Sequence, residues 1–178
     1  MTLLLAGLLL SSCVIRNYRP LRRKDVETVP VYETFNFDIK DSSQVINQSQ
    51  YLLKVKLAGI EQFASYHETI DSYPLTKLYV KLDEEGKQEE FVIYWRGGLI
   101  ETKKDKQEVS TKKKYIHYSF GDLLNLKKNK VYYMAVDEFE DSYILIANEY
   151  GLFEETEEGH QIKNNKTDKV IDLKSISD

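Results

Sequence analysis

Side chains that commonly carry out chemistry are few in this sequence and lie far apart. None of its histidines has a metal-ligand spacing around it: these are His67, His117 and His160. Adjacent carboxyl groups, as in Glu154-Glu155, lie in polar stretches where water keeps their acidity ordinary, so they make poor general acids. The sequence contains neither a nucleophile elbow nor a phosphate-binding glycine loop. We therefore expect no enzyme, and no catalytic, metal-binding or cofactor-binding residues.

The only cysteine, Cys13, has a context that does suggest chemistry. An apolar run from Leu3 to Leu10 and two serines precede it. This run is too short to cross a hydrocarbon core about 30 Å thick, which needs roughly 20 residues, but it has the length of the apolar region of a signal peptide. The stretch Leu10-Ser11-Ser12-Cys13 resembles the lipobox of a bacterial lipoprotein.

This resemblance implies that residues 1–12 are a signal peptide, removed on maturation, and that the Cys13 thiol then carries a lipid such as palmitate. It also implies a location in the cell envelope, with the lipid holding the protein on a membrane. Val14 follows the cysteine, where an aspartate would resemble an inner-membrane retention signal. The expected location is therefore the outer membrane, facing the periplasm. The resemblance suggests no family for the mature domain.

The net charge and the cysteine content limit which partners and which stabilising interactions we expect. The formal net charge is -4 and the pI is about 5.5, which gives a nucleic-acid partner no electrostatic support. The expected partners are the membrane, through the lipid on Cys13, and an envelope protein or glycan. Because Cys13 is the only thiol, the domain should be stabilised by packing without disulfides.

Residues 13–30 are predicted to be a lipidated tether. Pro20 and Pro30 interrupt regular structure there, and two acids accompany five bases: Arg16, Arg19, Arg22, Arg23 and Lys24. These bases could lie on anionic headgroups or simply be solvated.

Alternating apolar and polar residues predict a series of short strands, and one stretch has a helical period. Glu33 interrupts the apolar face of the first strand. Ile60, Phe63, Ala64, His67 and Ile70 form a helical stripe that Pro74 ends. Turn-like residues at 83–87 and 137–141 predict hairpins. The predicted strands are 31–39, 51–57, 78–82, 91–95, 115–120, 130–136 and 142–148, with a further short one at 152–153.

This pattern predicts an all-β fold, an antiparallel β-sandwich with one short helix over residues 31–153. A lipocalin-like β-barrel is the alternative, although the one tryptophan, Trp95, lies in mid-chain and not in a Gly-x-Trp near the first strand. Residues 154–178 are predicted to be a polar C-terminal tail, to which Val170, Ile171 and Leu173 could add one edge strand. Residues 121–126 could form one helical turn with Asp122 as its N-cap.

Two surface features could serve binding. Residues 101–114 contain six lysines and read as an exposed, mobile loop, which could attract anionic lipid headgroups or acidic glycans or could simply be solvated. Thirteen tyrosines are present, and tyrosine rings on a rigid sheet make good contact surfaces. The predicted contact surface consists of Tyr94, Tyr115, Tyr118 and Tyr132. The other reading of these residues is that tyrosine is simply favoured in strands.

The function we expect from these features is that of a membrane-anchored envelope lipoprotein acting as a non-enzymatic binding or assembly module. One alternative is a lipocalin-like carrier of a small apolar ligand. Another is a wall or glycan hydrolase, which would need a concave site around His117 or His67.

Overall fold

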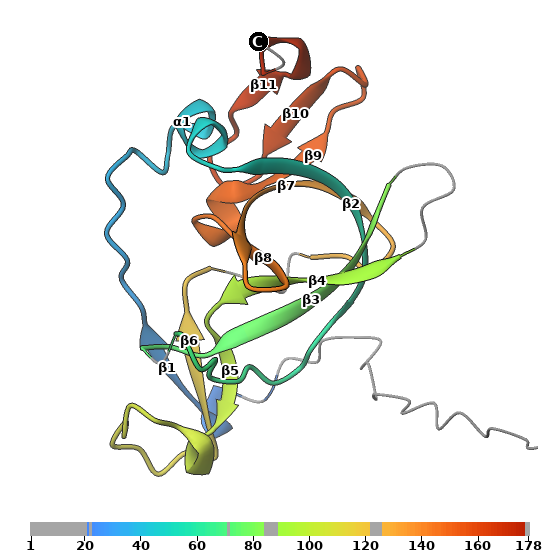
Figure 1. The fold of residues 1–178 in the computed structure, drawn as a ribbon. Helices are drawn as coiled ribbons and strands as arrows, with labels where there is room; N and C mark the ends of the chain where they lie inside the picture. The colour runs from blue at the N-terminus through green and yellow to red at the C-terminus, as the bar shows by residue number, and fades with distance from the viewer. Residues whose placement is uncertain (1–20, 22, 71, 84–88, 122–125, 177–178) are drawn as a thin grey trace, which may run out of the picture.

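The computed structural model describes residues 21, 23–70, 72–83, 89–121 and 126–176. Figure 1 shows their arrangement. The strands are β1 (Val26–Pro30), β2 (Tyr51–Ile60), β3 (Leu75–Leu82), β4 (Glu90–Arg96), β5 (Gly98–Glu101), β6 (Tyr115–Ser119), β7 (Val131–Phe139), β8 (Ser142–Leu145), β9 (Leu152–Glu155), β10 (Gln161–Asn164) and β11 (Val170–Asp172). The helices are α1 (Ser42–Asn47) and the 3-10 turns η1 (Arg23–Asp25), η2 (Thr102–Lys104), η4 (Asn148–Gly151) and η5 (Leu173–Ser175). The expected all-β class with one short α-helix is confirmed.

Five of the strands close into a ring. Their order is β7-β2-β3-β4-β8, and β8 pairs back onto β7. The β4–β8 pair is parallel and the other pairs of the ring are antiparallel. The result is a small Greek-key barrel, the kind of architecture found in OB-folds, and Figure 1 views the ring of strands end-on. This part of the chain corresponds to the barrel alternative, with five strands where lipocalins have eight.

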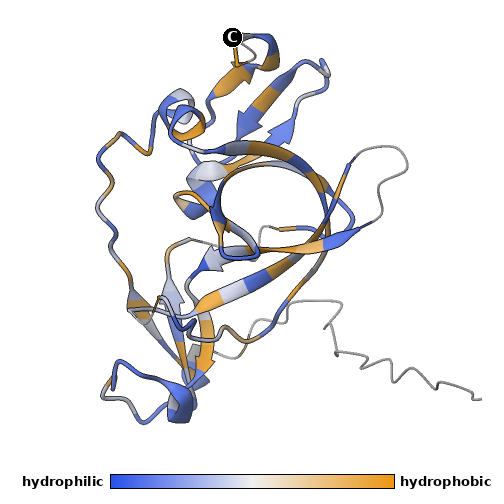
Figure 2. Cartoon of the chain, viewed as in Figure 1, coloured by the Kyte–Doolittle hydropathy of each residue, from blue (hydrophilic) through white to orange (hydrophobic). Residues whose placement is uncertain are grey.

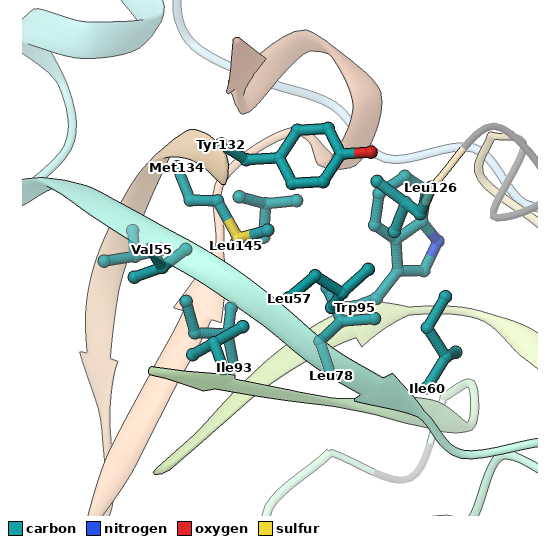
Figure 3. Packing of buried hydrophobic residues seen from close by; sticks show 12 residues of the cluster. Val55, Leu57, Ile60, Leu78, Ile93, Trp95, Leu126, Tyr132, Met134 and Leu145 are labelled. Carbon is teal, nitrogen blue, oxygen red and sulfur yellow. The ribbon is translucent and has the colours of Figure 1, made fainter. Parts of the chain in front are cut away.

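Side chains fill the interior of this barrel. Alternate residues of each strand point inward, as the period of a β-strand requires, and Figure 3 shows how they interlock. Trp95 is 1% exposed and Ile93 is fully buried. The buried core residues are Val55, Leu57, Ile60, Leu78, Val80, Ile93, Trp95, Leu126, Tyr132, Met134, Val136 and Leu145.

Two groups of strands flank the barrel, one continuous with its sheet and one forming a separate sheet. β9, β10 and β11 extend the sheet from β7, and α1 packs on them through Val45 and Ile46. β1, β6 and β5 form a separate three-stranded sheet in which β1 and β6 run parallel. Figure 2 shows apolar residues along the strands of the barrel and also in β5 and β11.

The predicted helix at 60–70 is wrong. Ile60 is the last residue of β2, and the following segment, residues 61–70, is not helical. Its amides pair with neighbouring strands: Ala64 N donates to Leu99 O (2.7 Å) and Ser65 N donates to Leu75 O (3.0 Å). The helix lies instead at Ser42–Asn47, where the Asp41 side chain accepts hydrogen bonds from Ser43 N and Gln44 N as an N-cap.

The segment 31–39, which we call the strap, is not a strand. Its burial does alternate residue by residue as the period-two pattern predicts, and Phe35, Phe37 and Ile39 pack beside α1. However, no described strand runs alongside it, and only Val31 N is hydrogen bonded to β6, at Ser119 O (3.1 Å). Alternation in sequence therefore reports which side faces the protein, and not whether a partner strand is present.

The domain boundaries also differ from expectation at both ends. The predicted tether includes Val26–Pro30, which form β1 because their backbone pairs with β6 over five positions. The predicted polar tail includes β10 and β11, where Ile162 is fully buried, and β11 confirms the expected edge strand. Residues 1–12, Cys13 and the predicted helical turn capped by Asp122 lie outside the described residues.

Both hairpins are confirmed: β3 pairs with β4, and β7 with β8. The strands predicted at 51–57, 78–82, 91–95, 115–120, 130–136, 142–148 and 152–153 correspond to β2, β3, β4, β6, β7, β8 and β9.

Candidate functional site

A groove lies beside the strap. It encloses a cavity of about 410 Å³, which falls within the range of small-ligand sites, roughly 300 to 1,000 Å³. The strap forms one wall, and the ends of β4 and β6 together with η4 form the rest. We call it the strap groove. Its charged and tyrosine lining residues are Tyr32, Glu33, Arg96, Glu149, Tyr150 and Lys166.

An ion pair between Glu33 and Arg96 joins the two walls. Glu33 Oε2 lies 3.3 Å from Arg96 Nε, and the side chains are 27% and 13% exposed. Tyr73 donates a hydrogen bond to Glu33 Oε1 (3.5 Å), and Arg96 Nη1 donates one to the carbonyl of Leu145. A charged residue on the inward face of the strap is thereby explained, because a buried charge requires an opposite charge beside it. The interruption that Glu33 makes in the apolar pattern was the one signal of this site in the sequence.

The position of Arg96 is fixed by Asn148 at the start of η4. The Asn148 side chain is 1% exposed; its Oδ1 accepts a hydrogen bond from Arg96 N (3.0 Å) and its Nδ2 donates one to Arg96 O (2.8 Å). Asn148 and the preceding Ala147 have φ values of 47° and 50°. A left-handed alanine is uncommon, and strained backbone of this kind often accompanies functional sites.

A second ion pair lies on the opposite side of the groove. Glu149 Oε1 is 2.7 Å from Lys166 Nζ. The fully buried Asn164 holds this region together, since its Nδ2 lies within hydrogen-bond distance of three carbonyl oxygens, those of Glu149, Tyr150 and Leu152 (2.9–3.0 Å). The groove thus presents charges of both signs beside tyrosine rings.

The chemistry available in the strap groove is that of binding. No histidine or cysteine is among its described lining residues, and the described part of the chain has no group of three acidic, histidine or cysteine residues placed to hold a metal ion. A second cavity, of about 430 Å³, lies between α1 and β11 and is lined mainly by exposed polar residues such as Lys40 and Lys169.

The structure separates the four tyrosines of the predicted contact surface. Tyr118 is 4% exposed and Tyr132 is fully buried, so the prediction is wrong for these two. Their strand registers point them inward, where the Tyr132 hydroxyl accepts a hydrogen bond from Lys127 N (2.8 Å). Tyr94 and Tyr115 are partly exposed but lie in separate places, and neither lines the strap groove.

Tyr94 belongs to an aromatic cluster with His67 and Phe139, at ring-centre distances of 5.7 and 5.3 Å. His67 Nε2 lies 3.2 Å from Glu140 Oε2, and its Nδ1 lies 3.0 Å from Thr69 Oγ1. Hydroxyl, imidazole and carboxylate occur here in the order of a hydrolytic triad. However, Thr69 and Glu140 are exposed, and neither described cavity includes this cluster. The arrangement holds the segment after β2 against the turn between β7 and β8.

His117 lies on β6 and is partly buried. It lines neither of the two cavities. The structure therefore brings the predicted histidines to no common site.

Residues 101–114, which we call the lysine loop, are mostly exposed as expected but are anchored at Asp105. Tyr66 and Tyr118 each donate a hydrogen bond to Asp105 Oδ1, at 2.7 and 2.8 Å, and Val109 N donates one to Oδ2 at 3.0 Å. Partial burial raises the pKa of Asp105, but these donors outweigh it and the net pKa lies below its ordinary value. Burial raises the pKa of Tyr66 to about 12, and the hydrogen bond that its hydroxyl donates to Asp105 acts in the same direction.

Comparisons with protein-family models, with curated proteins and with solved structures find no match to this chain. Within the described residues, no helix has both the length and the apolar character needed to cross a bilayer.

Replacing Glu33 by Gln should loosen the strap groove. The substitution leaves Arg96 largely buried without its counter-charge, so we expect the free energy of unfolding, measured in urea, to fall by about 1–3 kcal/mol. The control is Glu68→Gln, at an exposed position, which should change it by less than about 0.5 kcal/mol. Equal effects of the two substitutions would contradict the role assigned to the pair.

The Asp105 anchor should make stability depend on acid pH. Because the pKa of Asp105 is lower in the folded state, the stability that its carboxylate contributes is fully present above the ordinary aspartate pKa of 3.8 and is lost as the pH falls through the lowered folded pKa. The difference in unfolding free energy between the wild type and Asp105→Asn should therefore be constant near neutral pH and narrow below about 3.8. A difference that widens on acidification would contradict this assignment.

Proposed function

We propose that the protein is a lipoprotein of the cell envelope, held on the outer membrane by a lipid on Cys13, and that it binds an envelope partner in the strap groove without catalysing a reaction. The lipobox-like stretch Leu10-Ser11-Ser12-Cys13 supports the anchor. The strap groove, with its two ion pairs and tyrosine rings, is the observation that carries the binding role.

The lining favours a polypeptide over an uncharged glycan as the partner. Glu33 and Glu149 offer negative charge and Arg96 and Lys166 positive charge, so a segment with charged side chains of both signs has complementary groups to meet. Tyr32, which is 90% exposed, offers a large rigid ring for an apolar side chain. Tyrosines in such positions are frequent anchors of protein interfaces.

The two alternatives receive less support from the geometry. A lipocalin-like carrier needs space inside its barrel, whereas the described side chains fill this one, with Trp95 and Ile93 in its core. A hydrolase needs a concave site at a histidine, and neither described cavity is lined by His67 or His117.

Replacing Cys13 by Ala tests the anchor. We expect the variant to leave the membrane fraction and to lose incorporation of radiolabelled palmitate, because the thiol that would carry the lipid is gone. Asn17→Ala, four residues further along, is the control and should fractionate as the wild type does. Unchanged fractionation of the cysteine variant, with residues 1–12 still attached, would rule the anchor out.

Replacing Tyr32 by a photoreactive phenylalanine analogue tests the binding role. Irradiation of cells should join the protein to one envelope polypeptide, because this ring stands at the rim of the groove. The same analogue at Tyr51, an exposed tyrosine (42%) outside the groove, is the control and should give no such product. A crosslink from Tyr51 alone would contradict the strap groove as the binding site.

A further inference from the structure

The lysine loop and the entry of the chain into the fold lie at the same end of the three-stranded sheet. β1 and β6 run parallel, and the first residue of β1, Val26, is paired with the first residue of β6, Tyr115. Tyr115 is also paired with Glu101, the last residue of β5. Both ends of the loop therefore meet where the N-terminal segment joins the domain, as the lower part of Figure 1 shows.

The strap groove lies at the other end of this sheet. Its lining includes Pro30 and Ser119, the last residues of β1 and β6. With four residue steps of roughly 3.3 Å each along β1, the two ends are about 13 Å apart. The groove and the loop thus occupy opposite ends of the parallel pair.

Charge is unevenly divided between the loop and the remainder of the chain. The loop contains six lysines and three acids, a net charge of +3, whereas the whole chain carries -4, so the remaining residues carry -7. Lys103 and Lys104 are highly exposed, with side chains 77% and 67% accessible. Both lie near Glu101 Oε2, at 3.3 and 3.7 Å, but exposed ion pairs of this kind are weak and leave the lysines available to other anions.

The loop is held in place by its own hydrogen bonds. Thr102 N donates to Lys114 O (3.1 Å) and Thr102 Oγ1 donates to Lys113 O (2.8 Å), while Asp105 fixes the middle of the loop as described above. Lys113 Nζ donates to Val26 O (3.0 Å) and lies 3.3 Å from Glu27 Oε2. The loop is thereby tied to the strand through which the chain enters the fold.

We propose that the lysine loop lies against an anionic phospholipid surface. The inference rests on the proposed lipid anchor, because a lipid on Cys13 would bring the start of β1, and with it the loop, close to the bilayer. Each lysine near such a surface contributes favourably to binding within about a Debye length. In this orientation the acidic remainder of the domain and the strap groove face away from the membrane, toward the proposed partner.

Lysine acetylation of the full-length lipidated protein in vesicles tests this orientation. In vesicles that contain phosphatidylglycerol, we expect Lys103 and Lys104 to react about fivefold more slowly than in vesicles of phosphatidylcholine alone. Lys169, exposed beside β11, is the control and should react equally in both. High salt should abolish the difference, since it screens charge. Equal reactivity of the loop lysines in the two vesicle types would overturn the proposal.

Two further outcomes separate this proposal from others. If the protein does not float with either type of vesicle, the lipid anchor itself fails, and the orientation proposal fails with it. If soluble polygalacturonate protects the loop lysines to the same extent as anionic vesicles, the loop binds acidic glycans. This result would overturn the proposal that the loop lies against a lipid surface. Lys103→Glu with Lys104→Glu should remove the protection of Lys106, whereas Lys169→Glu should leave it unchanged.

Discussion

The structure depends on β7, because one edge of this strand pairs with two different strands, β8 and β9. Its other edge is paired with β2 along six positions, from Lys56 opposite Val131 to Tyr51 opposite Val136. On the shared edge, residues from Val136 onward pair with β8 and close the barrel. Tyr133 and Met134 pair with β9 and begin the part of the sheet that flanks the barrel. One strand therefore belongs to the barrel and to the sheet that extends from it.

Because β8 and β9 pair with the same edge of β7, the chain must leave this edge after β8 and rejoin it at β9 within a few residues. The segment from Ile146 to Gly151 loops out between these two pairings, with Ala147 and Asn148 in left-handed conformation, and the chain then continues along β7 in the same direction. A Cβ atom at Gly151 would lie 2.1 Å from Ile146 O, so no larger residue fits there without a shift of the backbone. The same segment supplies one wall of the strap groove, and the groove is consequently a by-product of how the barrel closes.

Much of this fold could be predicted from the sequence, but only where a local pattern decides the outcome. Alternation identified the barrel strands because one face of each is buried. It also identified the inward face of the strap, yet gave a strand where the structure has none, since pairing depends on distant segments. The helical stripe from Ile60 to Ile70 failed for the same reason, because its amides bond to β5 and β3. Register likewise decided that Tyr118 and Tyr132 point inward.

Most of the strap groove could not be predicted from the sequence. Glu33 was visible as an exception in an apolar face, but its partner Arg96 lies 63 positions away, and nothing local connects the two. The left-handed turn at Ala147 has no sequence signal either, since alanine is a poor indicator of that conformation. The reach of Asn148 to both backbone groups of Arg96 follows only from the closed barrel.

The parallel pairing of β1 with β6 has a mechanical consequence. A pull applied to the N-terminal segment acts along β1, so that its hydrogen bonds with β6 carry the load together in shear and do not open one after another. The five paired positions and the contact of Lys113 with Val26 and Glu27 resist that force side by side. A domain held by its N-terminus would thus be loaded in the direction in which the hydrogen bonds between β1 and β6 resist together.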